Sequence, residues 1–564
     1  MNNKKNKYNT LHYLIALLEA YGIKDVVASP GTQNARFNSI VQENVNFRCF
    51  SVVDERSAGY VATGIAHETE KPVVITCTGA TASRNYLSAM TEAYYRKIPI
   101  IAITFYACTT NSCSLSPHYI DRSVTQNDVK YISIDLPMIN TPVDAQNCIL
   151  MLNTALSAAV YKKQSVHINC PANNDFKTDF NTFPNIWKTE YYKEDFDYLK
   201  DCFKEKKVAV FIGSHDKFSK KEENSISDFA KSWDIPVFCD HISNYHGANK
   251  ILVSQAVNMV RLKKEYPNLI IDIGNVSGEY NCELLFRNAT IWRVSADGLL
   301  KCRSGRPVIK TFFCLENVFF ERLINSEIVK NGYYSVLKAK VEKIKIPELP
   351  LCYALVCKNL ANYMPKNCSL HLSILNSLRN MNFFNLDPTI DVNCNVGGFG
   401  IDGPVSTLIG QSLGNPNKKH FGLIGDLAFF YDMNILGNRN IKNNVRILVL
   451  NNNRGVEFRL NPAIENYFAD KTDILIASGG HNTNGVKCWA EACNFSYIYA
   501  DNKKDFVEQI NEFCNGEFDK PVLFEVITNV KDEQDGLKLM RTFNRNRIEE
   551  GIIDCYRHLK NIGK

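Results

Sequence analysis

Apolar residues recur along the chain with two different periods. Over 11–21 they follow helical spacing, and after Gly22 a short apolar strand is predicted over 25–28. Continuous apolar runs rich in β-branched residues predict further strands over 73–79, 98–105 and 165–171. Because helical patterns alternate with these runs, they indicate parallel strands that are covered on both faces by helices.

Two polar, charged segments interrupt this pattern at 173–201 and 338–350, and both are predicted to be linkers. More apolar runs follow each of them. The predicted strands are 208–213, 235–240 and 269–274 after the first linker, and 420–426, 445–453 and 521–527 after the second. The pattern therefore predicts an α/β fold with three doubly wound parallel-sheet domains.

Composition narrows the class of protein. The 564 residues are 45% hydrophobic and 22% charged, as in a soluble globular protein, and leave room for three domains. The net charge of +6 and the lack of a long basic run argue against a nucleic-acid partner. No apolar run is long enough to cross a membrane, and the polar N-terminus lacks a signal-peptide pattern. With 19 scattered cysteines and no CxxC pair, we expect a cytoplasmic protein with reduced thiols.

Two polar groups stand at the ends of apolar runs in the third block. Gly425 and Asp426 close one predicted strand and 451–453 close the next, with a helical stretch over about 427–440 between them. In a parallel sheet both groups lie at the carboxyl edge, where open α/β sheets bind ligands. The oxygens of Asp426 and Asn452 suit Mg²⁺ or Ca²⁺, and a glycine at 425 lets a bulky anion approach the backbone. Ordinary turn formation is the alternative explanation.

The separation of these groups resembles a known fingerprint. Asp426 and Asn452 are 26 residues apart, and enzymes of the thiamine-diphosphate superfamily carry Gly-Asp followed by Asn-Asn at this spacing. The resemblance implies bound thiamine diphosphate and Mg²⁺, with Asp426, Asn452 and the main-chain carbonyl of Arg454 as metal ligands. Gly425 and Leu427 are expected to contact the coenzyme.

An acidic pair in the first block stands where a strand runs into a helix, at Asp54 and Glu55. A carboxylate at a helix start is commonly a cap or a partner of the helix dipole. In thiamine-diphosphate enzymes the same junction carries a glutamate that hydrogen-bonds the aminopyrimidine ring and helps to remove a proton from the thiazolium. The resemblance therefore implies that Glu55 is both the catalytic acid and a coenzyme contact.

Longer strings extend the resemblance over essentially the whole chain. They are SPGTQN at Ser29, DERSAGYVATGIA at Asp54, EAYYRKIPIIAIT at Glu92, VHINCP at Val166, GIDGPVSTLIG at Gly400, GDLAFFYDMN at Gly425 and NNNRG at Asn451. These strings resemble the branch that contains 2-succinyl-5-enolpyruvyl-6-hydroxy-3-cyclohexene-1-carboxylate synthase of menaquinone biosynthesis. That branch implies a pyrimidine-binding domain over 1–180, a central domain over 190–340 and a diphosphate-binding domain over 350–564. It also implies that Ile401 lies under the thiazolium, with plain core packing as the alternative.

Most substrate-binding arginines of that branch are missing here. Gln33 and Val396 stand at two of their positions, and Ser373 follows Ser369 in the helix expected before the GIDG string; the segments 117–122 and 278–280 also depart. Losing one charge-assisted contact to a carboxylate costs about 1.5–3 kcal/mol, so a less anionic donor is expected. Arg84, Arg122, His118 and His371 could replace the missing charges, although surface or structural roles also explain them. The expected substrate contacts are Thr32, Gln33, His118, Ser369, His371 and Val396.

The expected function is decarboxylation of a 2-oxo acid with transfer of the acyl group to an unidentified acceptor. The alternatives are the menaquinone synthase itself, a simple 2-oxo acid decarboxylase, and a coenzyme-binding scaffold without catalysis. Because Glu55 and Asp426 fall in different predicted domains, a homodimer or homotetramer with shared active sites is expected. Small molecules, and neither nucleic acid nor membrane, are the expected partners. No Gly-rich dinucleotide fingerprint marks the central domain.

Overall fold

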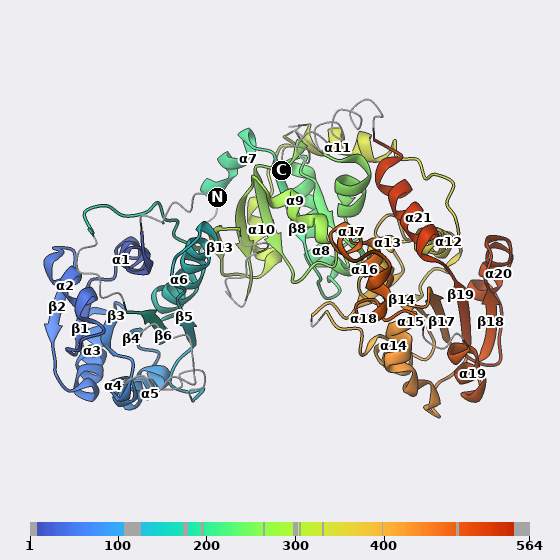
Figure 1. The fold of residues 1–564 in the computed structure, drawn as a ribbon. Coiled ribbons are helices and arrows are strands. Elements are labelled where there is room, and N and C mark those ends of the chain that lie inside the picture. Colours follow the sequence, from blue (N-terminus) through green and yellow to red (C-terminus); the bar gives the residue numbers. More distant parts are fainter. Residues whose placement is uncertain are drawn as a thin grey trace. The chain divides into compact units, whose positions relative to one another are not determined.

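The computed structural model describes residues 8–106, 126–172, 179–192, 197–262, 265–296, 303, 306–329, 332–397, 399–480 and 484–545. The chain divides into two compact units, Met1–Glu194 with Ile291–Phe313, and Asp195–Thr290 with Cys314–Lys564. The described strands form three parallel sheets flanked by helices (Figure 1). The predicted α/β class with parallel sheets is confirmed. The predicted domain boundaries stay a prediction.

The first sheet has the strand order β2-β1-β3-β4-β6-β5. Helices α1, α2 and α6 pack on one face, and α3 and α5 pack on the other, each face with its own apolar core. The strands are β1 Asp25–Ala28, β2 Arg48–Ser51, β3 Val73–Thr78, β4 Ile100–Tyr106, β5 Ile132–Asp135 and β6 Val166–Pro171. The helices are α1 Thr10–Ala20, α2 Ala35–Glu43, α3 Glu55–Thr69, α4 Thr81–Asn85, α5 Leu87–Arg96 and α6 Pro142–Lys162.

The middle strands divide between the two units. The first unit holds the order β12-β13-β7 and the second holds β10-β9-β8-β11. The strands are β7 Glu190–Tyr192, β8 Val208–Ile212, β9 Val237–Cys239, β10 Lys250–Leu252, β11 Leu269–Ile273, β12 Thr290–Val294 and β13 Val308–Phe312. The helices are α7 Asp201–Glu205, α8 Lys220–Ser232, a π-helix at Gln255–Val260, α9 Glu283–Phe286, α10 Glu316–Leu323 and α11 Tyr333–Val341.

Both predicted linkers contain some regular structure that the polar composition did not predict. Strand β7 lies inside 173–201 and pairs with β13, and α11 reaches into 338–350. Strand β7 has only three residues, all half-buried, and therefore shows no apolar run. In α11 the lysines lie on the exposed side of a helix whose Tyr333 and Leu337 are buried.

The third sheet has the order β15-β14-β16-β17-β19-β18, the same connection order as the first sheet. Helices α12, α13, α20 and α21 contribute to the core on one face, and α14, α15 and α19 contribute to the core on the other. The strands are β14 Ser369–Leu372, β15 Asp391–Cys394, β16 His420–Gly425, β17 Val445–Asn451, β18 Ser496–Ala500 and β19 Val522–Ile527. The helices are α12 Tyr353–Tyr363, α13 Asn376–Met381, α14 Pro404–Gly414, α15 Asp426–Asp432, α16 Val456–Leu460, α17 Pro462–Phe468, α18 Thr472–Leu475, α19 Gly485–Ala492, α20 Lys503–Asn515 and α21 Val530–Thr542.

The order of the third sheet creates a switch point. The chain passes from β14 to β15 on one side and returns to β16 on the other side of β14. Helices therefore leave the adjacent strand ends in opposite directions and open a crevice at the carboxyl edge, which is where ligands bind in such sheets. Among the described residues, no helix combines the length and apolar character that a membrane span requires.

Candidate coenzyme and metal site

Asp426 stands where β16 turns into α15 at this edge. Its side chain is buried, and one carboxylate oxygen accepts the main-chain N–H of Leu427 at 2.8 Å. The other oxygen accepts the main-chain N–H of Arg454 at 3.1 Å. Because Arg454 follows β17, one carboxylate ties together the loops that leave two neighbouring strands. Its position is thereby fixed before any ligand binds.

Asn452 follows the last residue of β17 and is also buried. Its amide oxygen has no hydrogen-bond partner among the described residues. The neighbouring Asn451 differs, since its amide donates to Glu525 at 2.7 Å and its oxygen accepts the N–H of Asn453 at 2.9 Å. A buried polar atom without a hydrogen-bond partner lowers the stability of the fold by about 1–3 kcal/mol, and such atoms are therefore rare in native proteins. The amide oxygen of Asn452 is thus available to a ligand.

These two oxygens fit a small hard cation held with a diphosphate. The described residues contain no group of three or more His, Cys, Asp or Glu side chains that could hold a metal alone. Mg²⁺ commonly uses one or two protein groups and completes its shell with phosphate oxygens and water. The main-chain carbonyl of Arg454 accepts the N–H of Val456 at 2.9 Å, and a carbonyl oxygen has a second lone pair. Its role as third ligand stays a prediction.

The floor of the site contains residues that the sequence analysis missed. A Cβ atom at Gly425 would come within 3.0 Å of the hydroxyl of Tyr353. The carboxyl group of Glu533 accepts the N–H of Tyr353 at 3.0 Å and the hydroxyl of Thr528 at 2.8 Å. Burial raises the pKa of Glu533 to about 8, and the negative charge of Asp426 raises it as well. Neither residue belongs to a motif, so only the fold could reveal them.

Leu427 and Ile401 are two further predicted coenzyme contacts in this unit. Leu427 is the second residue of α15, directly after Asp426, and a Cβ at Gly455 would meet its side chain at 3.3 Å. Ile401 is half-buried and packs against the apolar cores on both faces of the third sheet. The coenzyme contacts of both residues stay predictions.

Glu55 is the first residue of α3 in the first unit. The capping role that we considered for it belongs to Asp54, whose carboxylate accepts the N–H of Ser57 at 2.8 Å. The side chain of Glu55 instead accepts a hydrogen bond from the amide of Asn85 at 3.0 Å. Glu55 is thus oriented by a second side chain and has no part in capping its own helix.

The predicted substrate contacts of the first unit lie in the loop after β1. Thr32 is exposed and Gln33 is half-buried. The loop packs closely on β3, because a Cβ at Gly31 would approach the hydroxyl oxygen of Thr78 to 2.2 Å. His118 and Arg122 lie outside the described residues.

Three predicted substrate contacts of the second unit are buried. Ser369 begins β14 rather than standing in a helix, so this detail of the prediction is wrong; β14 pairs with strands on both sides. His371 is fully buried in the same strand, and burial lowers its pKa to about 4. Val396 belongs to the apolar core on one face of the third sheet. Their substrate roles stay predictions.

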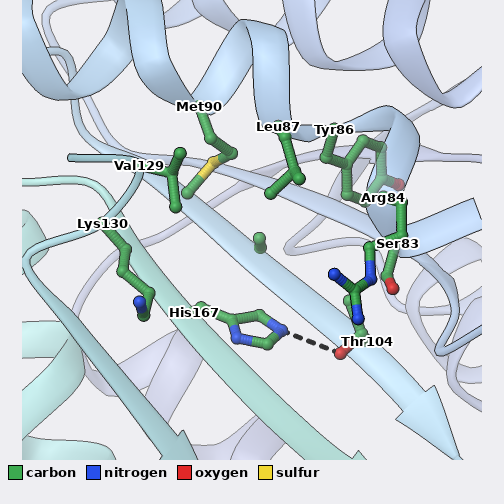
Figure 2. Close-up of a pocket in the computed structure, with 10 residues that line it drawn as sticks. Ser83, Arg84, Tyr86, Leu87, Met90, Thr104, Val129, Lys130 and His167 are labelled. Atoms are coloured by element: carbon green, nitrogen blue, oxygen red, sulfur yellow. Dashed lines mark hydrogen bonds between the residues drawn. The ribbon is translucent and has the colours of Figure 1, made fainter. Parts of the chain in front are cut away.

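Arg84 lines a separate cavity of about 50 Å³ in the first unit. Figure 2 shows Lys130 and His167 around the same cavity. The Nε2 atom of His167 is hydrogen-bonded to the hydroxyl of Thr104 at 2.9 Å. The other ring nitrogen of His167 meets the hydroxyl of Ser133 at 2.8 Å. The histidine of the VHINCP string therefore links neighbouring strands.

Comparison with known proteins identifies relatives that align with nearly the whole chain. The family described as thiamine pyrophosphate enzyme, N-terminal TPP binding domain, matches residues 8–131. A protein of Bacteroides thetaiotaomicron named 2-succinyl-5-enolpyruvyl-6-hydroxy-3-cyclohexene-1-carboxylate synthase is 30% identical over 93% of this chain and 96% of its own. One of Staphylococcus aureus with the same name is 26% identical over 91% and 93%. A third, from Bacteroides fragilis, is 30% identical over 99% of this chain and 100% of its own, and the chain belongs to this family of thiamine-diphosphate-dependent enzymes.

Proposed function

We propose that this chain uses thiamine diphosphate and Mg²⁺ to release CO₂ from a 2-oxo acid and to transfer the acyl remainder to an acceptor. The observation that carries the proposal is the pair at the third sheet's edge. Asp426 is a buried carboxylate fixed by two main-chain N–H groups, and Asn452 offers a buried oxygen without a partner. The bound coenzyme supplies the electron sink for the bond that breaks as CO₂ leaves.

The protein's residues supply positioning and a proton. Asp426, Asn452 and the carbonyl of Arg454 would hold the cation between the ends of β16 and β17. Glu55 would hold a proton near the coenzyme's ring nitrogen, with Asn85 orienting its carboxyl group. Because Asp54 caps α3, this task does not compete with the stability of the helix.

A homodimer that shares active sites is part of the proposal, with a homotetramer as the alternative. Exposed apolar side chains gather downstream of Arg454, where Tyr467 is 79% and Leu475 is 87% exposed. Val53, next to the acidic pair of the first unit, is 76% exposed. Apolar groups collected on a surface are typical of an interface, and a second copy of this chain would cover them. Leu475→Asp should shift the particle mass measured by light scattering towards the monomer.

The experiment that tests the function uses the purified full-length chain with thiamine diphosphate and Mg²⁺. CO₂ release is measured with a panel of 2-oxo acids, with and without carbonyl and alkene acceptors. Release that depends on both cofactors supports the proposal. No release from any member of the panel would refute it, and calorimetry without Mg²⁺-dependent coenzyme uptake would refute the site.

A second candidate is 2-succinyl-5-enolpyruvyl-6-hydroxy-3-cyclohexene-1-carboxylate synthase activity itself. Relatives with that name align with nearly the whole chain. This candidate predicts turnover of 2-oxoglutarate with isochorismate. An altered specificity is favoured by Gln33 and by the apolar surroundings of Val396, since neither side chain offers a charge to a carboxylate. A simple decarboxylase would differ from both by accumulating an aldehyde.

A further inference from the structure

A buried acid contacts the turn over 451–454, which carries Asn452. Glu525 stands in β19, between β17 and β18, and is 1% exposed. It shares a face of the sheet with Leu523 and Val449, because side chains two residues apart in a strand, and those opposite one another in register, point to the same side. Both of these neighbours belong to an apolar core. A carboxylate in such surroundings destabilises the fold unless its oxygens are hydrogen-bonded.

Both carboxylate oxygens of Glu525 have a partner from a neighbouring strand. One oxygen accepts the amide N–H of Asn451, the last residue of β17, at 2.7 Å. The other accepts the hydroxyl of Tyr497, in the edge strand β18, at 2.5 Å. Tyr497 is half-buried and packs against the same apolar core. The acid is therefore held from two sides, and the hydrogen bonds run across three adjacent strands.

The hydrogen bond to Glu525 determines which way the amide group of Asn451 points. The amide nitrogen donates to the acid, and the amide oxygen therefore faces the turn, where it accepts the main-chain N–H of Asn453 at 2.9 Å. In the reversed orientation the amide oxygen would face a carboxylate and the amide nitrogen would face an N–H donor, and both contacts would be repulsive. Glu525 thus fixes Asn451 and, through it, provides the N–H of Asn453 with an acceptor.

The turn is strained at the residue that this acceptor holds. Asn453 has a φ of 59°, in the left-handed region that residues with a side chain rarely adopt. Its N–H is held by Asn451, and the next N–H, that of Arg454, is held by the carboxylate of Asp426 at 3.1 Å. Asn452 lies between Asn451 and these two anchored N–H groups. The backbone from which the Asn452 side chain extends is therefore fixed on both sides.

We propose that Glu525 is a positioning residue of the cation site. Through Asn451 it holds the turn that would present the oxygens of Asn452 and Arg454 to the cation, and the hydroxyl of Tyr497 in turn holds Glu525. The inference rests on the proposed function, because it assumes that a cation binds at this turn together with the coenzyme. A contribution of Glu525 to the stability of the third sheet alone is the competing explanation.

A comparison of two cations separates positioning from stability. Mg²⁺ requires nearly ideal octahedral geometry with oxygens at about 2.0–2.1 Å, whereas Ca²⁺ accepts variable geometry at about 2.3–2.6 Å. A loosened turn should therefore weaken coenzyme uptake with Mg²⁺ more than uptake with Ca²⁺. The measurement is equilibrium dialysis of thiamine diphosphate with the full-length protein at a series of concentrations of each cation. The cation concentration that gives half-maximal uptake is the midpoint.

Two variants and a matched control test the hydrogen bonds. Tyr497→Phe removes the hydroxyl that holds Glu525 and keeps the aromatic ring, so the Mg²⁺ midpoint should rise about 5-fold, the equivalent of one hydrogen bond. Glu525→Leu removes the acid and should raise the midpoint about 10- to 100-fold, as is typical when a partner of a metal-binding group is lost. The control is Tyr499→Phe on the same strand and face, because the hydroxyl of Tyr499 donates to Asp501 at 3.3 Å. The control should leave the midpoint unchanged.

Thermal unfolding of each variant is measured beside the midpoints. A Mg²⁺ midpoint that rises more than the Ca²⁺ midpoint in both variants supports the inference. Unchanged midpoints with a lower unfolding temperature would assign Glu525 to stability alone, and Tyr497→Phe decides this question even if Glu525→Leu does not fold. An equal rise for both cations, or a rise in Tyr499→Phe, would also overturn the inference, since it would indicate general loosening of the sheet.

The wild-type protein separates this inference from the proposed function. If the wild type takes up no coenzyme with either cation, the proposed function fails and this inference fails with it. If the wild type takes up coenzyme with Mg²⁺ but releases no CO₂ from any 2-oxo acid, the proposed reaction fails, and the midpoints of the variants still decide whether Glu525 positions the cation site.

Discussion

The first and third sheets share one connection order and differ in where they carry polar groups. In the first sheet the acid Glu55 follows β2, an edge strand whose residues are largely exposed. In the third sheet Asp426 and Asn452 follow β16 and β17, two adjacent central strands that are buried throughout most of their length. A single backbone plan therefore carries different polar groups at the strand ends of the two sheets, which fits the different tasks that we propose for them.

The switch points of the two sheets show the same contrast. In the third sheet the hydroxyl of Ser373 accepts a hydrogen bond from the N–H of Gly425, and the crevice is lined by groups that suit a cation and an anion. In the first sheet the loop after β1 closes on β3 so tightly that Gly31 has no room for a side chain beside Thr78. The lesson is that an identical topology does not imply an equivalent ligand site.

The largest effect is expected at the first sheet's acid. Glu55→Gln keeps the size of the side chain and removes its proton transfer, so turnover should fall by about 100- to 10,000-fold. Calorimetry should show coenzyme affinity changed only a few-fold, and proton exchange at the coenzyme's thiazolium should stop in an NMR assay. Glu70→Gln, at the exposed end of the same helix, is the control. A variant of Glu55 with unchanged exchange would remove the acid from the proposal.

Removal of the Asp426 carboxylate in the third sheet should act on coenzyme binding, in contrast to Glu55→Gln, which acts on turnover. Asp426→Asn should weaken Mg²⁺-dependent coenzyme uptake by about 100- to 1,000-fold, because a fixed charge at the cation is lost. The measurement is calorimetry across a series of Mg²⁺ concentrations. Asp519→Asn, an exposed acid before β19, should leave uptake unchanged. Uptake that is equally strong in Asp426→Asn and wild type would disprove the assignment of the metal site.

Two corresponding strands of the first and third sheets differ at one buried position. His371 is the third residue of β14, and the third residue of β1 is Val27; both are fully buried. Burial lowers the pKa of His371 from 6.5 to about 4, so the unfolded chain binds a proton first as the pH falls. Stability is complete above pH 6.5 and is lost towards pH 4, by about 3 kcal/mol.

His371→Val copies the first sheet and should abolish this pH dependence, although the smaller side chain lowers stability at neutral pH. The measurement is the urea midpoint at several values between pH 4 and pH 7. The slope with pH, rather than the absolute midpoint, decides the outcome. An unchanged slope in the variant would assign the acid sensitivity to other groups.

The smallest effect is expected at the first sheet's closed loop. Gly31→Ala places a Cβ atom 2.2 Å from the hydroxyl oxygen of Thr78 and should destabilise the chain by about 1–3 kcal/mol. Thr78→Ala in the same chain should recover part of that loss in thermal unfolding. Gly64→Ala in α3, where the new atom meets nothing within 4 Å, should instead stabilise by about 0.5–1 kcal/mol.

The strands that could be predicted from the sequence are the central ones. Strands β3, β8 and β17 are buried on both faces, and their sequences are therefore continuous apolar runs. Edge strands escaped prediction for the opposite reason: β2 is mostly exposed, and β15 mixes one buried position with three half-buried ones. These segments are strands because their backbones pair with an adjacent strand of the sheet. Such pairing leaves no apolar run in the sequence.

The candidate site divides in the same way. Asp426 and Asn452 could be predicted because each directly follows a strand, so their spacing in the sequence is fixed by one helical crossover. Tyr353 and Glu533 could not be predicted. They stand at the starts of α12 and α21, which are widely separated along the chain, and only the packing of these helices brings the two residues together.

The division of labour between Asp54 and Glu55 has a consequence for genetics. Asp54 secures the start of α3 through the N–H of Ser57, whereas its neighbour has no such duty. Mutations at codon 54 should therefore give temperature-sensitive alleles. Growth at low temperature, or a stabilising second-site mutation, should restore the function of these alleles. Lesions at codon 55 should be null at every temperature, so two adjacent codons would give opposite phenotypes in one suppressor screen.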